Sequence, residues 1–142
     1  MGKRYYFRHF STTADIGLTV SADITADLLR GAAWGMFSTM FDLHTIPFKK
    51  NSSFKFTADP FEELPILFLN EFLYLFSINK LVPLSFPSLK EVKNTIDATV
   101  SWGELTSKSR YKGNEIKAVT YQLYRWDHLP GKRQHLRIVF DV

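Results

Sequence analysis

The sequence of 142 residues is 45% hydrophobic, contains 13 Phe and no cysteine, and carries a formal net charge of +4. This length predicts one domain, residues 1–142, with a ring-rich core, and the absence of cysteine excludes disulfides and thiolate metal sites. The first ten residues lack the apolar stretch of a signal peptide, and the most apolar run, residues 66–76, is too short for a membrane span, so we expect a cytoplasmic protein.

The N-terminal region predicts two strands, residues 5–10 and 17–22, joined by a short polar segment that contains Asp15. A carboxylate on a short connection between rigid strands is a common way to present a functional group, although Asp in such a segment is also a frequent turn former. Gly17 is expected to supply unusual backbone angles at this connection.

A helix is predicted over residues 26–41, with Asp23 or Thr25 as its N-cap, because apolar residues there follow helical spacing. Gly31 and Gly35 inside this helix each cost about 1 kcal/mol relative to Ala. They therefore indicate close packing against a neighbouring element.

The next predicted elements are a turn around Pro47, a strand over residues 52–58, and a second helix that ends near Asn79. Asp59-Pro60 is typical of a helix start, with Asp at the N-cap, while Pro65 indicates either a kink or a later start near Glu62. Because this helix is apolar nearly all round, we expect it to be covered on several sides.

The remainder of the chain predicts strands. They cover residues 82–89 (an edge strand, because of its two prolines), 96–102, 115–126 and 134–142, with a loop over 105–114 and a turn over 128–132. Helices early and strands late predict an α+β fold, a mostly antiparallel β-sheet structure packed with two main α-helices.

No common catalytic or nucleotide-binding motif is present, and the four histidines lack the spacing of a zinc site. The strand that ends at Val142 places the α-carboxylate beside Asp141. If the first and last strands are neighbours, Asp15 approaches both groups. Three such carboxylates would repel one another, and a hard divalent cation with oxygen ligands and water would remove that cost.

Four segments together resemble the archease family: residues 13–17 (TADIG), 69–76 (LNEFLYLF), 115–121 (EIKAVTY) and 138–142 (IVFDV). They occur in the family's order and spread over nearly the whole chain. The resemblance implies an accessory protein, not an enzyme, that promotes guanylylation and turnover of an RtcB-type RNA ligase in tRNA splicing and RNA repair. That ligase uses GTP and manganese.

The resemblance also implies a divalent-cation site formed by Asp15, Asp141 and Val142, with Ca²⁺ favoured and Mg²⁺ or Mn²⁺ as alternatives. Lys117 is implied to take part in the interaction with the ligase. For the protein as a whole, the resemblance implies at most weak or indirect contact with RNA and no contact with a membrane. The chain departs from the family at Thr12 and Gln122, where the family has histidines. Neither side chain can titrate near neutral pH or act as an imidazole ligand, and the joint loss suggests that the two positions are neighbours.

Two other functions stay open on the residues alone. The last third of the chain is basic, which suits an RNA- or protein-binding modulator of a tRNA-modifying enzyme, or merely solvated strand edges. The basic residues are Lys108, Arg110, Lys112, Lys117, Arg125, Lys132, Arg133 and Arg137. A metal-dependent hydrolase built on Asp15 and Asp141 ranks lower, because no general base is in view.

Overall fold

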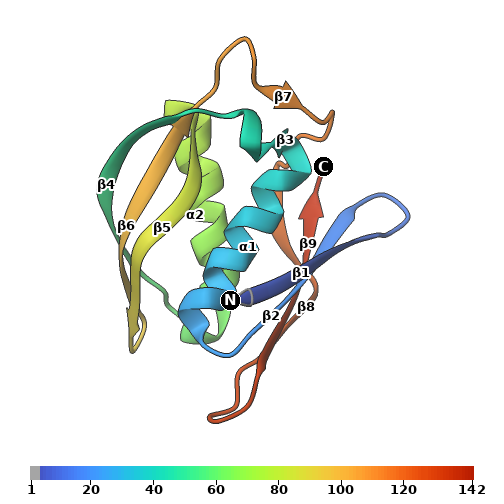
Figure 1. The fold of residues 1–142 in the computed structure, drawn as a ribbon. Helices are drawn as coiled ribbons and strands as arrows, with labels where there is room; N and C mark the ends of the chain where they lie inside the picture. Colours follow the sequence, from blue (N-terminus) through green and yellow to red (C-terminus); the bar gives the residue numbers. More distant parts are fainter. Residues whose placement is uncertain (1–3) are drawn as a thin grey trace.

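The computed structural model describes residues 4–142, which form an α+β domain with two α-helices between antiparallel sheets (Figure 1). One sheet has the order β1-β2-β9-β8, made of Tyr5–Ser11, Ile16–Ala22, Gln134–Asp141 and Ala118–Asp127. The other has the order β4-β6-β5, made of Phe48–Thr57, Thr95–Glu104 and Leu81–Val92. The predicted fold class is confirmed.

The two helices are α1, Thr25–Met40, and α2, Leu64–Asn79. Short 3-10 turns, η1 (Leu43–Thr45) and η2 (Phe61–Glu63), precede β4 and α2, and β3 (Phe41–Asp42) pairs with β7 (Arg110–Tyr111). Within residues 4–142, neither helix is long and apolar enough to cross a membrane.

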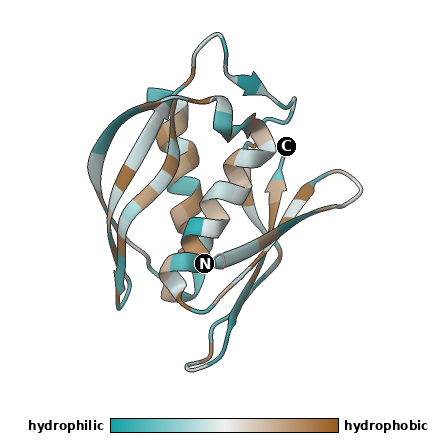
Figure 2. Cartoon of the chain, in the orientation of Figure 1, coloured by the Kyte–Doolittle hydropathy of each residue, from teal (hydrophilic) through white to brown (hydrophobic). Residues whose placement is uncertain are grey.

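Aromatic rings fill the layer between α2 and the three-stranded sheet, as the phenylalanine content predicts. Figure 2 shows hydrophobic residues along α2 and on the strands of this sheet. Phe72 of α2 is fully buried, and its ring centroid lies 4.6 Å from that of Phe54, 4.9 Å from Phe68 and 5.7 Å from Trp102. Interdigitated rings of this kind carry a large share of the energy of a core. The second helix is therefore held mainly by side-chain packing.

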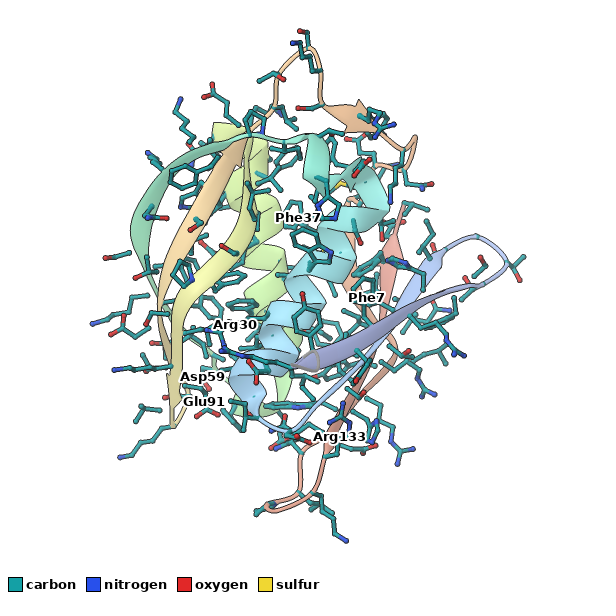
Figure 3. The ribbon with its side chains drawn as sticks, in the orientation of Figure 1. Phe7, Arg30, Phe37, Asp59, Glu91 and Arg133 are labelled. Carbon is teal, nitrogen blue, oxygen red and sulfur yellow. The ribbon has the colours of Figure 1, made fainter. Side chains whose placement is uncertain are left out.

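The glycines of α1 pack closely against the four-stranded sheet, as expected. A Cβ at Gly31 would fall 2.7 Å from the Tyr5 ring, and a Cβ at Gly35 would fall 2.8 Å from the side chain of Leu18. On its other side α1 reaches the three-stranded sheet through Arg30, which donates to the Phe86 carbonyl and pairs with Asp27 (Figure 3). Close approach thus outweighs the cost of glycine in a helix.

The predicted helix caps are wrong. The N-cap of α1 is Ile24, with no side-chain cap, because both candidates bond to residues at the start of β9: Asp23 pairs with Arg133 at 2.8 Å, and Thr25 accepts from Gln134 at 2.9 Å. At the second helix Asp59 is not the N-cap, since η2 intervenes and α2 starts at Leu64. The later start indicated by Pro65 is confirmed.

Other boundaries also differ. The strand β4 begins at Phe48, inside the predicted turn, because its pairing with β6 continues to Gly103. The loop over 105–114 contains the short strand β7. The helix α2 is covered only along its first part, since Tyr74 and Ile78 are 59% and 56% exposed. The strand β5 is an irregular edge strand, as its prolines predict.

The strand predicted over 115–126 begins later, at Ala118, and its alternation breaks. The pairing of β8 with β9 shifts between Thr120 and Arg125, and Leu123 adopts a φ of 57°. Tyr121 and Leu123, which simple alternation places on the same side as Val119, are therefore exposed while Val119 is buried. The bulge adds residues to one strand and turns these side chains outward.

Candidate functional site

Strand register brings the residues predicted for the cation site to one end of the four-stranded sheet. In the β2–β9 ladder Ile16 pairs with Phe140, so the next residues outward, Asp15 and Asp141, lie at the same end of these two strands. In the β8–β9 ladder Ala118 pairs with Asp141, which sets Lys117 opposite Val142. The strand β9 lies between β2 and β8, not beside β1, so Asp15 reaches Asp141 because it directly precedes β2.

Thr12 fixes the backbone of Asp15 in the β1–β2 turn. Its hydroxyl accepts a hydrogen bond from the Asp15 N–H at 3.0 Å and donates to the Asp15 carbonyl at 3.2 Å, and its own N–H donates to the same carbonyl. The Asp15 side chain is half-buried and has no hydrogen-bond partner among residues 4–142. The turn therefore holds the residue while leaving its carboxylate available.

The carboxyl end of β9 is held from both sides. The backbone N–H of Lys117 donates to the Asp141 carbonyl at 2.7 Å, and the Val142 side chain packs against the edge of the core. The Asp141 side chain points to solvent. Main-chain pairing and side-chain packing together fix the backbone at Asp141 and Val142, and the Asp141 side chain remains accessible.

The donors present suit a hard cation. Within the part of the chain that the structure describes, three or more His, Cys, Asp or Glu side chains nowhere converge on a metal-sized site. At the end of the β2–β9 ladder, Asp15 and Asp141 directly adjoin the last paired residues, Ile16 and Phe140, and both carry carboxylate oxygens. Oxygen-only ligands with open positions for water are typical of Ca²⁺ and Mg²⁺ sites. The cation site at Asp15, Asp141 and Val142 stays a prediction.

Lys117 lies in the short segment between Asn114 and β8, with its side chain exposed. A hollow of about 460 Å³ separates this segment from the end of α2, lined among others by Tyr74, Lys80 and Lys117. Lysine ammonium groups beside an exposed tyrosine can receive an anionic partner group. The predicted role of Lys117 toward a partner stays a prediction.

The two positions that lack the family's histidines are not neighbours. Thr12 follows β1, and Gln122 lies in the bulge of β8, so they sit at opposite edges of the sheet with β2 and β9 between them. Three strand spacings correspond to roughly 14 Å. The inference that both side chains belong to one site is therefore wrong for this chain, and Thr12 alone adjoins Asp15.

Sequence patterns miss the residue that ties the site to the core. Asn70 of α2 accepts from the Val119 N–H at 2.9 Å and donates to the Val119 carbonyl at 3.1 Å. In the sequence it only interrupts an apolar run. A polar residue that interrupts such a run is the signal that could have found it, because a polar group packed among apolar side chains needs a hydrogen-bond partner.

The glycine of the opening segment has a different role from the one predicted. Gly17 lies within β2, has no positive φ, and pairs directly with Phe10, whose ring covers it. A Cβ there would overlap that ring. The residue is thus needed for close approach across the β1–β2 ladder, which sets the position of the turn that carries Asp15.

Comparison with known proteins agrees with this architecture. The chain is 27% identical over 139 residues to the protein archease of Pyrococcus furiosus, which covers 96% of this chain and 98% of that protein. It is 29% identical over 147 residues to the protein archease of Methanosarcina mazei, covering 99% and 97%.

Two solved structures share the fold. The solution structure of Methanobacterium thermoautotrophicum protein 1598 superposes with a TM-score of 0.77 over 99% of this chain and 100% of that one, at 21% identity. The crystal structure of an archease from Thermotoga maritima, described as a possible chaperone, gives 0.66 over 94% of each chain, also at 21% identity. The family described as "Archease protein family (MTH1598/TM1083)" matches residues 7–142, and the chain belongs to this family.

Proposed function

We propose that this protein is a divalent-cation-binding accessory protein, not an enzyme, that activates an RtcB-type RNA ligase by promoting its guanylylation and turnover. Family membership supports the ligase as partner. The observation that supports the proposal is the strand register, which brings Asp15, Asp141, Val142 and Lys117 to the same end of the four-stranded sheet. One accessible end of a rigid sheet thus offers several carboxylates and a lysine to a partner.

In this proposal Asp15, Asp141 and the Val142 α-carboxylate hold the cation, and Thr12 keeps the Asp15 backbone in place. A bound cation supplies charge neutralisation, without which three adjacent carboxylates repel one another. The end of the four-stranded sheet that carries the cation then enters the nucleotide site of the ligase. Lys117, exposed on the adjoining strand position, contributes positive charge toward phosphate.

Guanylylation of the ligase from the same organism tests this function. Radiolabelled GTP is incubated with the ligase and manganese, with and without this protein, and the labelled ligase is quantified. The wild-type protein is expected to raise the rate, and Asp15→Ala to return it to the unstimulated value. Asp97→Ala serves as the control, because Asp97 is an exposed aspartate on β6, in the other sheet. Full stimulation by Asp15→Ala would refute the proposal.

The cation site has a test that does not depend on the ligase. Appending residues after Val142 converts the α-carboxylate into an amide and removes one anionic ligand. Calorimetric titration with Ca²⁺ is expected to show weaker binding for the extended protein than for the protein ending at Val142, with Mg²⁺ and Mn²⁺ titrated in parallel. Unchanged affinity in the extended protein would exclude the terminal carboxylate as a ligand.

A further inference from the structure

The outer face of the four-stranded sheet carries a row of arginines. Cross-strand pairing aligns Arg8 with Thr19, Thr19 with Arg137, and Arg137 with Arg125, so three arginines lie on one line across β1, β2, β9 and β8. All three side chains are exposed. Members of such a row lie on the same face of the sheet, and the row spans roughly 14 Å.

This row is costly for a folded domain. Arg137 and Arg125 are direct cross-strand partners, and like charges directly opposite one another on a sheet are destabilising. Arg125 is partly compensated, since it donates to both carboxylate oxygens of Asp127. Arg8 makes no ion pair with any residue from 4 to 142. The folded chain by itself leaves part of this positive charge unneutralised.

The middle arginine is held in place by the β8 bulge. The Nε of Arg137 donates to the Leu123 carbonyl at 2.7 Å, and Leu123 adopts a φ of 57°, which is unfavourable for a leucine. The two terminal nitrogens of Arg137 have no hydrogen-bond partner in residues 4–142. A planar guanidinium fixed at one nitrogen, with free N–H groups on the other two, is preorganised for bidentate contact with an oxyanion such as phosphate.

The row lines a shallow groove of about 560 Å³, bordered by Tyr6, Ser21 and His135 of the neighbouring row. Tyr6 is 57% exposed, and the Arg133 guanidinium lies 5.5 Å from its ring centroid. In Figure 3 Arg133 lies near the start of β9, at the end of the sheet away from the C-terminus. Arginines interleaved with an exposed aromatic ring are typical of surfaces that bind single-stranded nucleic acid.

We propose that this outer face, centred on Arg8, Arg137 and Arg125, binds the phosphodiester backbone of a single-stranded nucleic acid. The guanidinium groups contact successive phosphates, and Tyr6 offers a surface for a base. The face is separate from the end of the sheet where Asp15 and Asp141 meet, so the binding does not depend on ligase activation. The proposal assigns nucleic-acid binding to one face of the sheet, whereas the sequence alone indicates only that the last third of the chain is basic.

The test is fluorescence anisotropy with labelled RNA and DNA oligonucleotides of one sequence, titrated with the protein at several KCl concentrations. The comparison variants are the double change Arg8→Gln with Arg137→Gln and the double change Lys55→Gln with Lys90→Gln. Both remove two charges, but the lysines are exposed on the three-stranded sheet, on either side of Asp97. Circular dichroism melting checks that each variant folds.

The wild type is expected to bind with an affinity that falls steeply between about 50 and 200 mM KCl. The Kd of the arginine variant is expected to be about tenfold higher than that of the wild type. The slope of log Kd against log salt concentration is expected to fall by about 1.4, because two phosphate contacts are lost. The lysine control keeps the wild-type values. Preference for RNA or for DNA identifies which polymer supplies the backbone.

Three outcomes would overturn the proposal. They are absence of binding by the wild type at low salt, equal weakening by the arginine and lysine variants, and displacement of the oligonucleotide by an equal charge of poly-glutamate. The last outcome would assign the face to an acidic protein partner instead. Guanylylation assays without RNA should be unaffected by the arginine variant, which keeps this proposal distinguishable from ligase activation.

Discussion

The two larger sheets of this domain are built for different purposes. The three-stranded sheet packs Phe54, Phe86 and Trp102 onto the rings of α2, and all three side chains are buried. The four-stranded sheet carries an arginine row on its outer face and two aspartates at one end. The inner face of the four-stranded sheet is also buried, at Leu18 and Phe140 for example, so this sheet combines core packing with an ordered array of charge.

This difference predicts which mutations should change stability and which should change function. Changes in the ring layer should lower stability without reaching the charged end, whereas changes at the charged end should leave the fold intact. Asn70 is the exception, because it lies on α2 but bonds to Val119 of β8. The following substitutions test whether the two sheets can be separated in this way.

Phe72→Ala should have the largest effect on stability. The ring is fully buried and contacts aromatic residues of β4, β5, β6 and α2. Its removal leaves a cavity and should lower the free energy of unfolding by about 3–5 kcal/mol. Urea unfolding followed by fluorescence measures the loss. Phe48→Ala is the matched control, since Phe48 lies on β4 of the three-stranded sheet but is 60% exposed. Similar losses in the two variants would contradict the assigned role of the ring layer.

Asn70→Ala should have an intermediate effect, about 1–3 kcal/mol, because it leaves the buried N–H and C=O of Val119 without their side-chain partners. Amide hydrogen exchange at Val119 should become faster, which a general loss of packing in α2 would not produce selectively. Ser77→Ala removes an exposed hydrogen bond on the same helix and should change stability by less than about 0.5 kcal/mol. Unchanged exchange at Val119 would argue against the link.

Asp15→Asn should have the smallest effect in the absence of cation, within about 0.5 kcal/mol, because Thr12 bonds to the Asp15 backbone and not to its carboxylate. Saturating Ca²⁺ should then raise the melting temperature of the wild type but not of the variant, since only binding to the folded state stabilises it. Asp97→Asn is the control and should respond to Ca²⁺ like the wild type. An equal shift for Asp15→Asn would place the cation elsewhere.

Much of the fold could be predicted because its elements follow strong local patterns. The alternation in β2, β6 and β9 and the helical spacing in α1 survive in the structure nearly unchanged. The errors arise where tertiary contacts compete with local signals. Asp23 and Thr25 are good capping residues, yet both bond to the start of β9 instead. The bulge of β8 has no local signal, because Leu123 is an unusual residue for a positive φ.

The candidate site could be predicted only in part for a similar reason. The residues themselves stand in short recognisable segments, but their adjacency depends on strand order. The condition that the first strand adjoins the last is not met, since β2 lies between β1 and β9, but Asp15 directly precedes β2 and therefore lies at the same end of the sheet as Asp141. The arginine row is invisible along the chain, because its members come from β1, β9 and β8 and align only after pairing.

The interior position of β9 has a consequence for how the domain folds. This strand follows every other element in the chain, yet it lies between β2 and β8, so β2 must pair with a segment nearly a full chain length away. Contacts this distant carry a high loop-closure entropy and slow the search for the native topology. Until β9 arrives, the β1–β2 hairpin exposes an unpaired edge beside the apolar side chains Leu18 and Val20. The hairpin is therefore the segment most vulnerable to association with other nascent chains during synthesis.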